Sequence, residues 1–208
     1  MRAVALALAL ILLPAARASA DIQIKPFIAG TFGGATTFGN SYIEQFGDAK
    51  RTYGVTAVWL GGFFGVEGDF GWTPGIFEST KRPVLNPVTT TNVVDSGCRT
   101  FTGNVVIAAP RRVTEYTLRP YLSGGGGLIQ VRSVNELPAF SFASNLQVVD
   151  VGGGATGFLT DRVGVSWDLR YFRSMRGKIG GFSVGAPEEL SFWRINMAFV
   201  VRLRHHTR

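Results

Sequence analysis

The stretch LSFWRINMAFVVRLR, residues 190–204, decides the fold that this sequence predicts. Its alternate positions form two series of different character. One series is apolar throughout: Trp193, Ile195, Met197, Phe199, Val201 and Leu203. The other is mostly polar or small: Arg194, Asn196, Ala198, Val200, Arg202 and Arg204. A period of two predicts an extended strand whose two faces meet different surroundings. A soluble two-sheet sandwich gives the same alternation. A long, bulky apolar face opposite arginines favours lipid outside and a polar barrel interior.

The first twenty residues have the three parts of a secretory signal peptide. Arg2 supplies positive charge, residues 3–13 are apolar, and Ala18-Ser19-Ala20 is a small-x-small cleavage site. The apolar run is shorter than the roughly 20 residues that a transmembrane helix needs. We therefore expect residues 1–20 to be removed after export and residues 21–208 to form one barrel domain. No later segment is apolar for long enough to cross a membrane as a helix, so a spanning chain would have to be a closed barrel.

Composition and charge exclude several other classes of protein. The net charge is +7, and removing Arg2 and Arg17 with the signal peptide lowers it by two, to +5. The basic residues are spread along an exported chain, which argues against nucleic acid as a partner. Cys98 is the only cysteine. An intramolecular disulfide is therefore impossible, and Cys98, expected in a long loop, is either a free thiol or an intermolecular link.

Eight extended segments are predicted, separated by connections that alternate between long and short. The segments are residues 22–32, 51–60, 63–72, 100–109, 116–131, 146–158, 163–172 and 190–204. We expect Gly61-Gly62 to form a two-residue hairpin turn with positive φ, and a bulge or bend at Gly124 to Gly127. Alternating connections are typical of an outer-membrane barrel with short periplasmic turns and long extracellular loops. The sequence therefore predicts an all-β, eight-stranded antiparallel up-and-down transmembrane β-barrel, with both termini in the periplasm.

The two faces of these strands predict two sets of residues. Charged side chains expected in the lumen are Lys25, Glu67, Asp69, Arg119, Asp150, Asp168, Arg170, Arg194 and Arg202. Four acids against five bases suggest paired networks that fill the narrow interior of an eight-stranded barrel. Aromatic side chains expected in two girdles at the headgroup levels are Tyr53, Trp59, Trp72, Phe101, Tyr116, Tyr171 and Trp193. Core aromatics of a soluble protein are the alternative for this second set.

The order of several weak patterns resembles the small outer-membrane barrels of the OmpA/OmpX type. These patterns are Ala20-Asp21-Ile22, the segment RPYLSGGG at 119–126, the strand WDLRY at 167–171 and the amphipathic last strand. The resemblance covers nearly the whole mature chain. It implies an outer-membrane location, contact with outer-membrane lipid and assembly by the barrel assembly machinery. Such barrels usually end on an aromatic residue, whereas this chain ends at Leu203 to Arg208, so Phe199 and Leu203 serve instead or the assembly signal is atypical.

Recognition is expected in two long loops, Thr73 to Arg99 and Arg173 to Glu189, because binding diversity concentrates in loops on a rigid scaffold. The second loop is basic through Arg173, Arg176 and Lys178, which could contact lipopolysaccharide phosphates.

No pattern in the sequence supports catalysis, a cofactor or a metal. Residues 152–157 match G-x-G-x-x-G, but residues 158–162 leave no room for the helix that a dinucleotide site needs. Glu67 and Asp69 are two apart because they share one strand face. His205 and His206 are adjacent with no third ligand at metal spacing, and no predicted strand contains a histidine for a hydrolase. We therefore expect a structural or surface-interaction protein. The alternatives are a narrow channel or hydrophobic-ligand transport barrel, a soluble periplasmic lipocalin-like barrel and, third, an outer-membrane enzyme.

Overall fold

The structure is a computed structural model, and it describes residues 21–36, 44–45, 49–76, 93–110, 118–135, 142–178 and 190–203. The expected signal peptide, Tyr116 and the His205-His206 pair lie outside these residues. No helix in the described part of the chain is long and apolar enough to cross a membrane.

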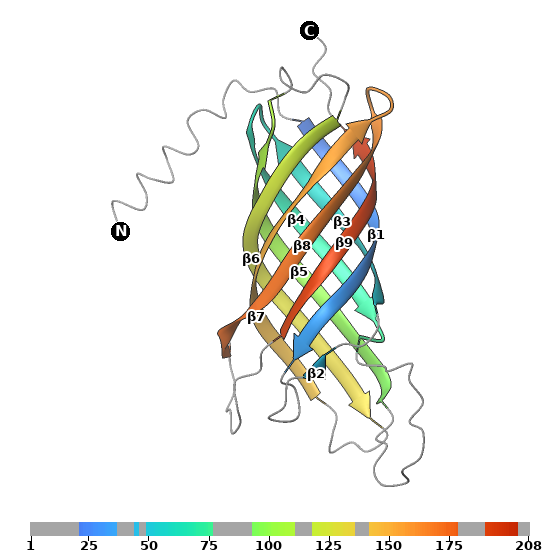
Figure 1. The fold of residues 1–208 in the computed structure, drawn as a ribbon, viewed down its shortest axis with the longest axis vertical. Helices are drawn as coiled ribbons and strands as arrows, with labels where there is room; N and C mark the ends of the chain where they lie inside the picture. Colours follow the sequence, from blue (N-terminus) through green and yellow to red (C-terminus); the bar gives the residue numbers. More distant parts are fainter. Residues whose placement is uncertain are drawn as a thin grey trace, which may run out of the picture.

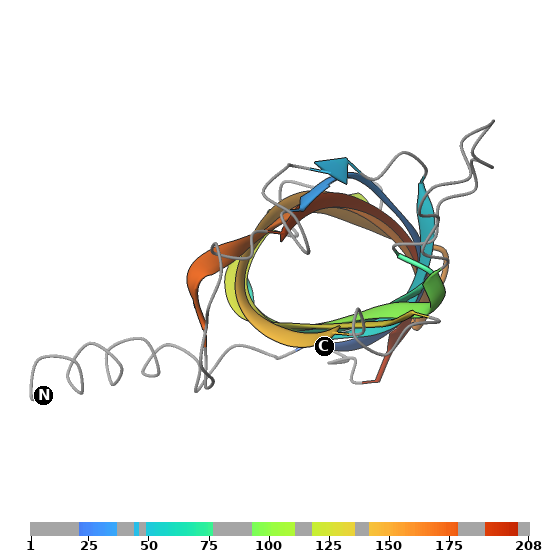
Figure 2. The same ribbon diagram turned by 90° about the horizontal axis from the view of Figure 1, so that it is seen from below.

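Eight long antiparallel strands form a closed barrel in the described chain (Figure 1). They are β1 (Asp21–Thr36), β3 (Lys50–Leu60), β4 (Phe64–Pro74), β5 (Val93–Ala108), β6 (Leu118–Asn135), β7 (Phe142–Phe158), β8 (Val163–Lys178) and β9 (Leu190–Arg202). Each long strand pairs with the next, and β1 pairs with β9 to close the ring that Figure 2 shows end on. The short β2 (Glu44–Gln45) pairs only with the end of β1. The predicted fold class is confirmed.

The apolar series of each strand faces outward and the polar series faces inward. On β9, Met197 is 74% exposed whereas Arg194 is 0% exposed. On β8, Trp167 and Leu169 are exposed, while Asp168 and Arg170 between them are buried. The alternative of a soluble lipocalin-like barrel needs the opposite arrangement, with the apolar series inside. These strands do not have that arrangement.

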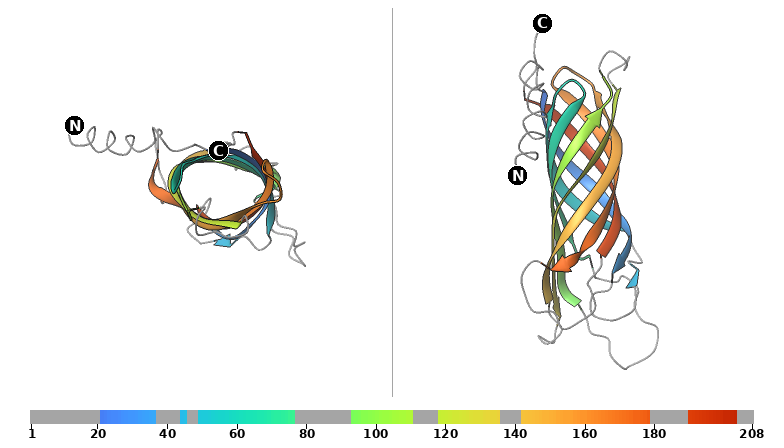
Figure 3. Two further views of the ribbon diagram at one scale, coloured as in Figure 1. Left: turned by 90° about the horizontal axis from the view of Figure 1, so that it is seen from above. Right: turned by 90° about the vertical axis from the view of Figure 1, so that its left-hand side faces the viewer.

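Both ends of the barrel sequence lie at the same rim. The backbone N–H of Leu203 donates to the carbonyl oxygen of Ile22 over 2.8 Å. The connections at residues 61–63 and 159–162 lie at this rim too, as the side view in Figure 3 shows. We call it the turn end, and the opposite rim the loop end.

Strands reach further toward the loop end than their alternation predicts. β5 begins at Val93, β6 continues to Asn135, and β8 continues to Lys178. The connection between β6 and β7 is therefore only residues 136–141, shorter than residues 109–117 between β5 and β6 at the turn end. The predicted strict alternation of long and short connections is wrong at this pair. Polar and apolar residues do not alternate cleanly near the loop ends of these strands, so the sequence pattern ended the strands too early.

Three local expectations are corrected by these longer strands. Cys98 lies on β5, not in a loop, and is only 1% exposed, so it is not available for an intermolecular link. Arg173, Arg176 and Lys178 lie on β8, not in a basic loop. The glycines from Gly124 to Gly127 pair in continuous register with both β5 and β7, so the expected bulge is absent.

The first hairpin turn also differs from its prediction. Residues 61–63 separate β3 from β4, and the backbone N–H of Gly61 donates to the carbonyl oxygen of Phe64 over 2.8 Å. Neither Gly61 nor Gly62 has a positive φ; among described glycines that conformation occurs at Gly33 and Gly75. A three-residue connection closes this hairpin without the left-handed conformation that a two-residue turn requires.

Candidate functional site

Two arginines and three acids meet inside the middle of the barrel. We call this group, Glu67, Asp69, Asp168, Arg170 and Arg194, the central charged layer. Its members come from β4, β8 and β9, and all five are buried. Strand alternation turns them inward because each shares the inward-facing parity of its own strand: odd-numbered on β4, even-numbered on β8 and β9.

Arg170 joins two of the acids. Its Nη1 and Nη2 donate to the two carboxylate oxygens of Glu67 over 2.5 and 3.1 Å, and its Nε donates to Asp168 Oδ1 over 2.8 Å. Neutral donors complete the acids: Asn104 donates to Glu67 over 2.9 Å, and Tyr121 and Asn196 donate to Asp168 over 2.9 and 2.7 Å. A buried ion pair is tolerated only when its remaining lone pairs and protons are satisfied in this way.

Arg194 forms the second pair. Its Nη2 donates to Asp69 Oδ1 over 2.6 Å, and Thr56 donates to the other oxygen of Asp69 over 2.9 Å. The guanidinium also lies against two aromatic faces, 4.9 Å from the ring centre of Phe27 and 4.7 Å from that of Phe172. These contacts compensate a buried cation for part of its lost hydration.

Two inward glycines make room for the arginines. A Cβ on Gly71 would lie 2.6 Å from Nη1 of Arg194 and 2.7 Å from the hydroxyl oxygen of Thr100. A Cβ on Gly152 would lie 2.6 Å from Cγ of Arg170. These distances are below contact, so the glycines of β4 and β7 are a packing requirement of the charged layer.

The other charged residues expected in the lumen lie apart from this layer. Lys25 donates to Thr156 over 3.1 Å, and its Nζ lies 4.8 Å from the ring centre of Tyr121. Arg119 donates to the backbone carbonyls of Ala109 and Gly62 over 2.8 and 2.6 Å, so it holds two turns. Asp150 is buried, and neither of its carboxylate oxygens has a hydrogen-bond partner in the described chain.

Arg202 lies at the turn-end rim. Its Nε is 2.9 Å from Asp21 Oδ1, and its guanidinium lies 3.6 Å from the ring centre of Phe158. Its Nη1 donates to the carbonyl of Asp161 over 3.0 Å. Asp21, which the sequence analysis left out of the lumen set, is therefore the partner that ties the first strand to the last.

The loop end of the interior is apolar, which the sequence analysis missed. This loop-end apolar layer consists of Ile76, Cys98, Ile129, Val131, Leu146, Val148, Phe172, Leu190 and Phe192. The rings of Phe172 and Phe192 stack with centres 5.0 Å apart. The alternation of inward and outward positions could have predicted that both rings point inward. Phe172 shares a face with Arg170, and Phe192 shares a face with Arg194. This apolar layer closes the interior between the central charged layer and the loop end.

Little space remains at the turn end of the lumen. A cavity there, beside Lys25, Arg119 and Tyr121, has a volume of about 10 Å³. A single water needs about 10–15 Å³ of such volume. The inward side chains therefore fill this part of the barrel.

Aromatic side chains lie on the outer surface near both rims. Of the expected girdle residues, Tyr53, Trp59, Trp72, Phe101 and Trp193 are exposed, and Tyr171 is half-buried. The rings of Tyr171 and Trp193 are 4.9 Å apart. Phe63, Phe64 and Trp167 are also exposed toward the turn end and were missed.

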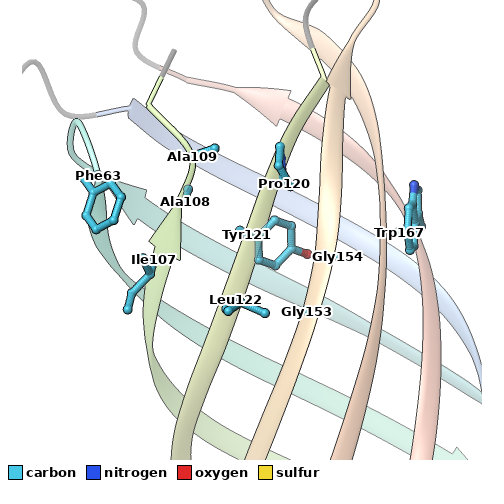
Figure 4. Close-up of a pocket in the computed structure, with 10 residues that line it drawn as sticks. All are labelled: Phe63, Ile107, Ala108, Ala109, Pro120, Tyr121, Leu122, Gly153, Gly154 and Trp167. Atoms are coloured by element: carbon cyan, nitrogen blue, oxygen red, sulfur yellow. The ribbon is translucent and has the colours of Figure 1, made fainter. Parts of the chain in front are cut away.

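A shallow apolar groove of about 450 Å³ runs along the outer surface near the turn end (Figure 4). Phe63 and Ile107 border one side and Trp167 the other, and Gly153 and Gly154 lie between Leu122 and Trp167. The groove exists because Gly153 has no side chain among outward apolar neighbours. No group of three or more histidine, cysteine, aspartate or glutamate residues in the described chain is placed to hold a metal ion.

An apolar exterior, a charged interior and closure of the last strand on the first define the class of small transmembrane-type β-barrels. No protein-family model matches the chain, and no curated protein matches it in sequence. Among solved structures, the chain is similar to Neisserial surface protein A, NspA, with a TM-score of 0.55, 13% identity, and 88% of this chain and 97% of that chain covered. The predicted resemblance to small outer-membrane barrels is thereby confirmed for the fold.

Two further solved structures align over a similar length. They are Ail, the attachment invasion locus protein of Yersinia pestis (TM-score 0.47, 14% identity, 88% of this chain and 98% of that chain), and the N-terminal β-barrel domain of Pseudomonas aeruginosa OprF (TM-score 0.45, 12% identity, 88% and 98%).

Proposed function

We propose that this chain is an integral outer-membrane barrel with a structural or surface-interaction role and without enzyme activity. The observation that carries the proposal is the outward apolar series, which includes Ile28, Leu122, Val151 and Met197 at 60% exposure or more. In water such a surface would be a large aggregation liability, whereas in lipid it is the stable arrangement. Residues 1–20 act as the cleaved export signal, and the barrel assembly machinery inserts the chain.

Electrophoresis in SDS with and without boiling tests this proposal. A closed barrel resists cold SDS, because all its strand hydrogen bonds are internal and no edge is open to the detergent. We expect the unboiled protein from the outer-membrane fraction to migrate faster than the boiled protein. A protein that stays in the soluble periplasm and shows no shift would contradict the proposal.

We also propose that the lumen is plugged. Two layers of side chains support this: the ion pairs of the central charged layer and the loop-end apolar layer. The small volume of the cavity at the turn end supports it as well. The alternative of a narrow channel needs a continuous water-filled path past Arg170 and Phe172. We therefore expect no conductance steps when the purified barrel is inserted into a planar bilayer, and reproducible steps would favour the channel.

Recognition of other molecules falls to the loop end. Residues 77–92 and 179–189, which connect strands at this end, lie outside the described residues. They belong to the two loops expected to bind partners, Thr73 to Arg99 and Arg173 to Glu189, and a plugged barrel would serve as their rigid support. Lipopolysaccharide is the proposed lipid partner at this end.

A further inference from the structure

Four arginines point outward from the loop end of the barrel. They are Arg51 on β3, Arg99 on β5, Arg132 on β6 and Arg173 on β8, and all four are exposed. We call them the arginine collar. Arg173 is the only member that the sequence analysis had singled out.

The collar lies just beyond the aromatic residues of the loop end. Arg51, Arg99 and Arg173 each stand two residues further toward this rim than Tyr53, Phe101 and Tyr171, respectively, on the same outward face. Two strand residues correspond to about 6.6 Å. Because interfacial aromatics sit at the headgroup level, the guanidiniums reach the polar side of the headgroup region.

Among the acidic side chains whose exposure the structure describes, none lies on the outer surface at the loop end. Asp21, Glu67, Asp69, Asp150 and Asp168 are buried inside the barrel. Asp161, the described acid that is exposed, lies at the turn end. No side-chain hydrogen bond or ion pair joins any collar arginine to another described residue. Within the described side chains, the loop end of the outer surface therefore carries four exposed arginines and no exposed carboxylate.

Arg99 and Arg132 form the closest pair in the collar. Arg132 pairs across strands with Gly97, and Arg99 pairs with Gln130, so the two arginines are diagonal neighbours on one face. Diagonal neighbours are about 7–8 Å apart, within reach of two long side chains converging on one anion. Gln130 and Asn145, which pair with each other beside Arg99, are exposed and add neutral donors.

We propose that the arginine collar binds phosphate groups of lipid headgroups in the leaflet at the loop end, with Arg99 and Arg132 as its principal site. The inference rests on the proposed membrane location and adds the residues and the ligand chemistry. Guanidinium groups bind phosphate through two parallel charge-assisted hydrogen bonds. The adjacent aromatic girdle favours a lipid headgroup over a soluble anion, because it fixes the collar at headgroup depth.

Binding of a bisphosphorylated glycolipid, lipid A, to the refolded full barrel in detergent micelles tests the site. The variant Arg99→Gln/Arg132→Gln removes the paired charges, and Arg162→Gln removes an exposed arginine at the turn end as a matched control. We expect about tenfold weaker binding of lipid A for the double variant, since two exposed charged contacts contribute about 0.7 kcal/mol each. The control should bind as the unaltered barrel does. Lipid A without phosphates should bind all three proteins equally.

Two outcomes would overturn the site. One is unchanged lipid A binding by the double variant. The other is an equal loss in the Arg162→Gln control, which would mean that only net charge matters. The cold-SDS shift separates this failure from failure of the proposed function: a barrel that shifts but binds lipid A without Arg99 and Arg132 loses the site alone.

Discussion

Replacing Arg170 with methionine lowers the free energy of unfolding of the barrel by about 3–5 kcal/mol, because it strands two buried carboxylates. Glu67 loses both of its hydrogen bonds to the guanidinium, and Asp168 loses the one from Nε. Methionine replaces the unbranched aliphatic part of the arginine side chain, so the loss combines the charge with the packing of the guanidinium. Urea unfolding of the barrel in lipid vesicles, followed by tryptophan fluorescence, measures it.

Two further variants show whether the loss comes from the ion pair. Arg170→Met/Glu67→Gln removes one stranded charge and should recover part of the stability lost by the single variant. Arg162→Met, on the exposed turn, should stay within about 0.5 kcal/mol of the unaltered barrel. A single variant that unfolds like the unaltered barrel, or a double variant less stable than the single, would mean that the central charged layer does not stabilise the fold.

Replacing Met197 with arginine distinguishes lipid from water outside the barrel. Met197 is 74% exposed in the middle of β9. In a bilayer, an arginine at this depth destabilises the barrel by about 2–4 kcal/mol. In water, an exposed substitution of this kind changes stability by only about 0.5 kcal/mol.

Leu159→Arg is the matched control for this comparison. Leu159 is as exposed as Met197, at 75%, but lies in the turn between β7 and β8. Near an interface the expected cost is about 0–1 kcal/mol. The same urea unfolding in vesicles measures both variants. Equal small effects at Met197 and Leu159 would contradict a lipid-facing surface.

The strand faces could be predicted from the sequence, because the physics that sets them is local. Alternation in β8 and β9 assigned Arg170 and Arg194 to the interior and Trp167 and Met197 to the exterior. The same parity on β4 assigned Glu67 and Asp69 inward. Which acid meets which arginine depends on the stagger between strands far apart in the chain, such as β4 and β8, and no local pattern contains that information.

The strand ends, and with them the burial of Cys98, were the parts that local patterns could not supply. Cys98 follows a long stretch rich in proline and threonine, so it looked like part of a loop. Its burial depends on β6 beside it and on Phe172 and Phe192 across the interior. Gly61-Gly62 looked like a tight turn by composition alone, but the register between β3 and β4 sets a three-residue connection.

The pairing of β1 with β9 has a consequence for how the protein is made. These two strands come from opposite ends of the chain, and Gln23 pairs with Arg202. The sheet therefore has two open edges until the last strand has been synthesised, and contacts this distant in sequence form slowly. Open edges with alternating apolar side chains invite aggregation. A protein truncated before β9 keeps both edges open, so we expect it to aggregate or be degraded and not to accumulate as a closed barrel.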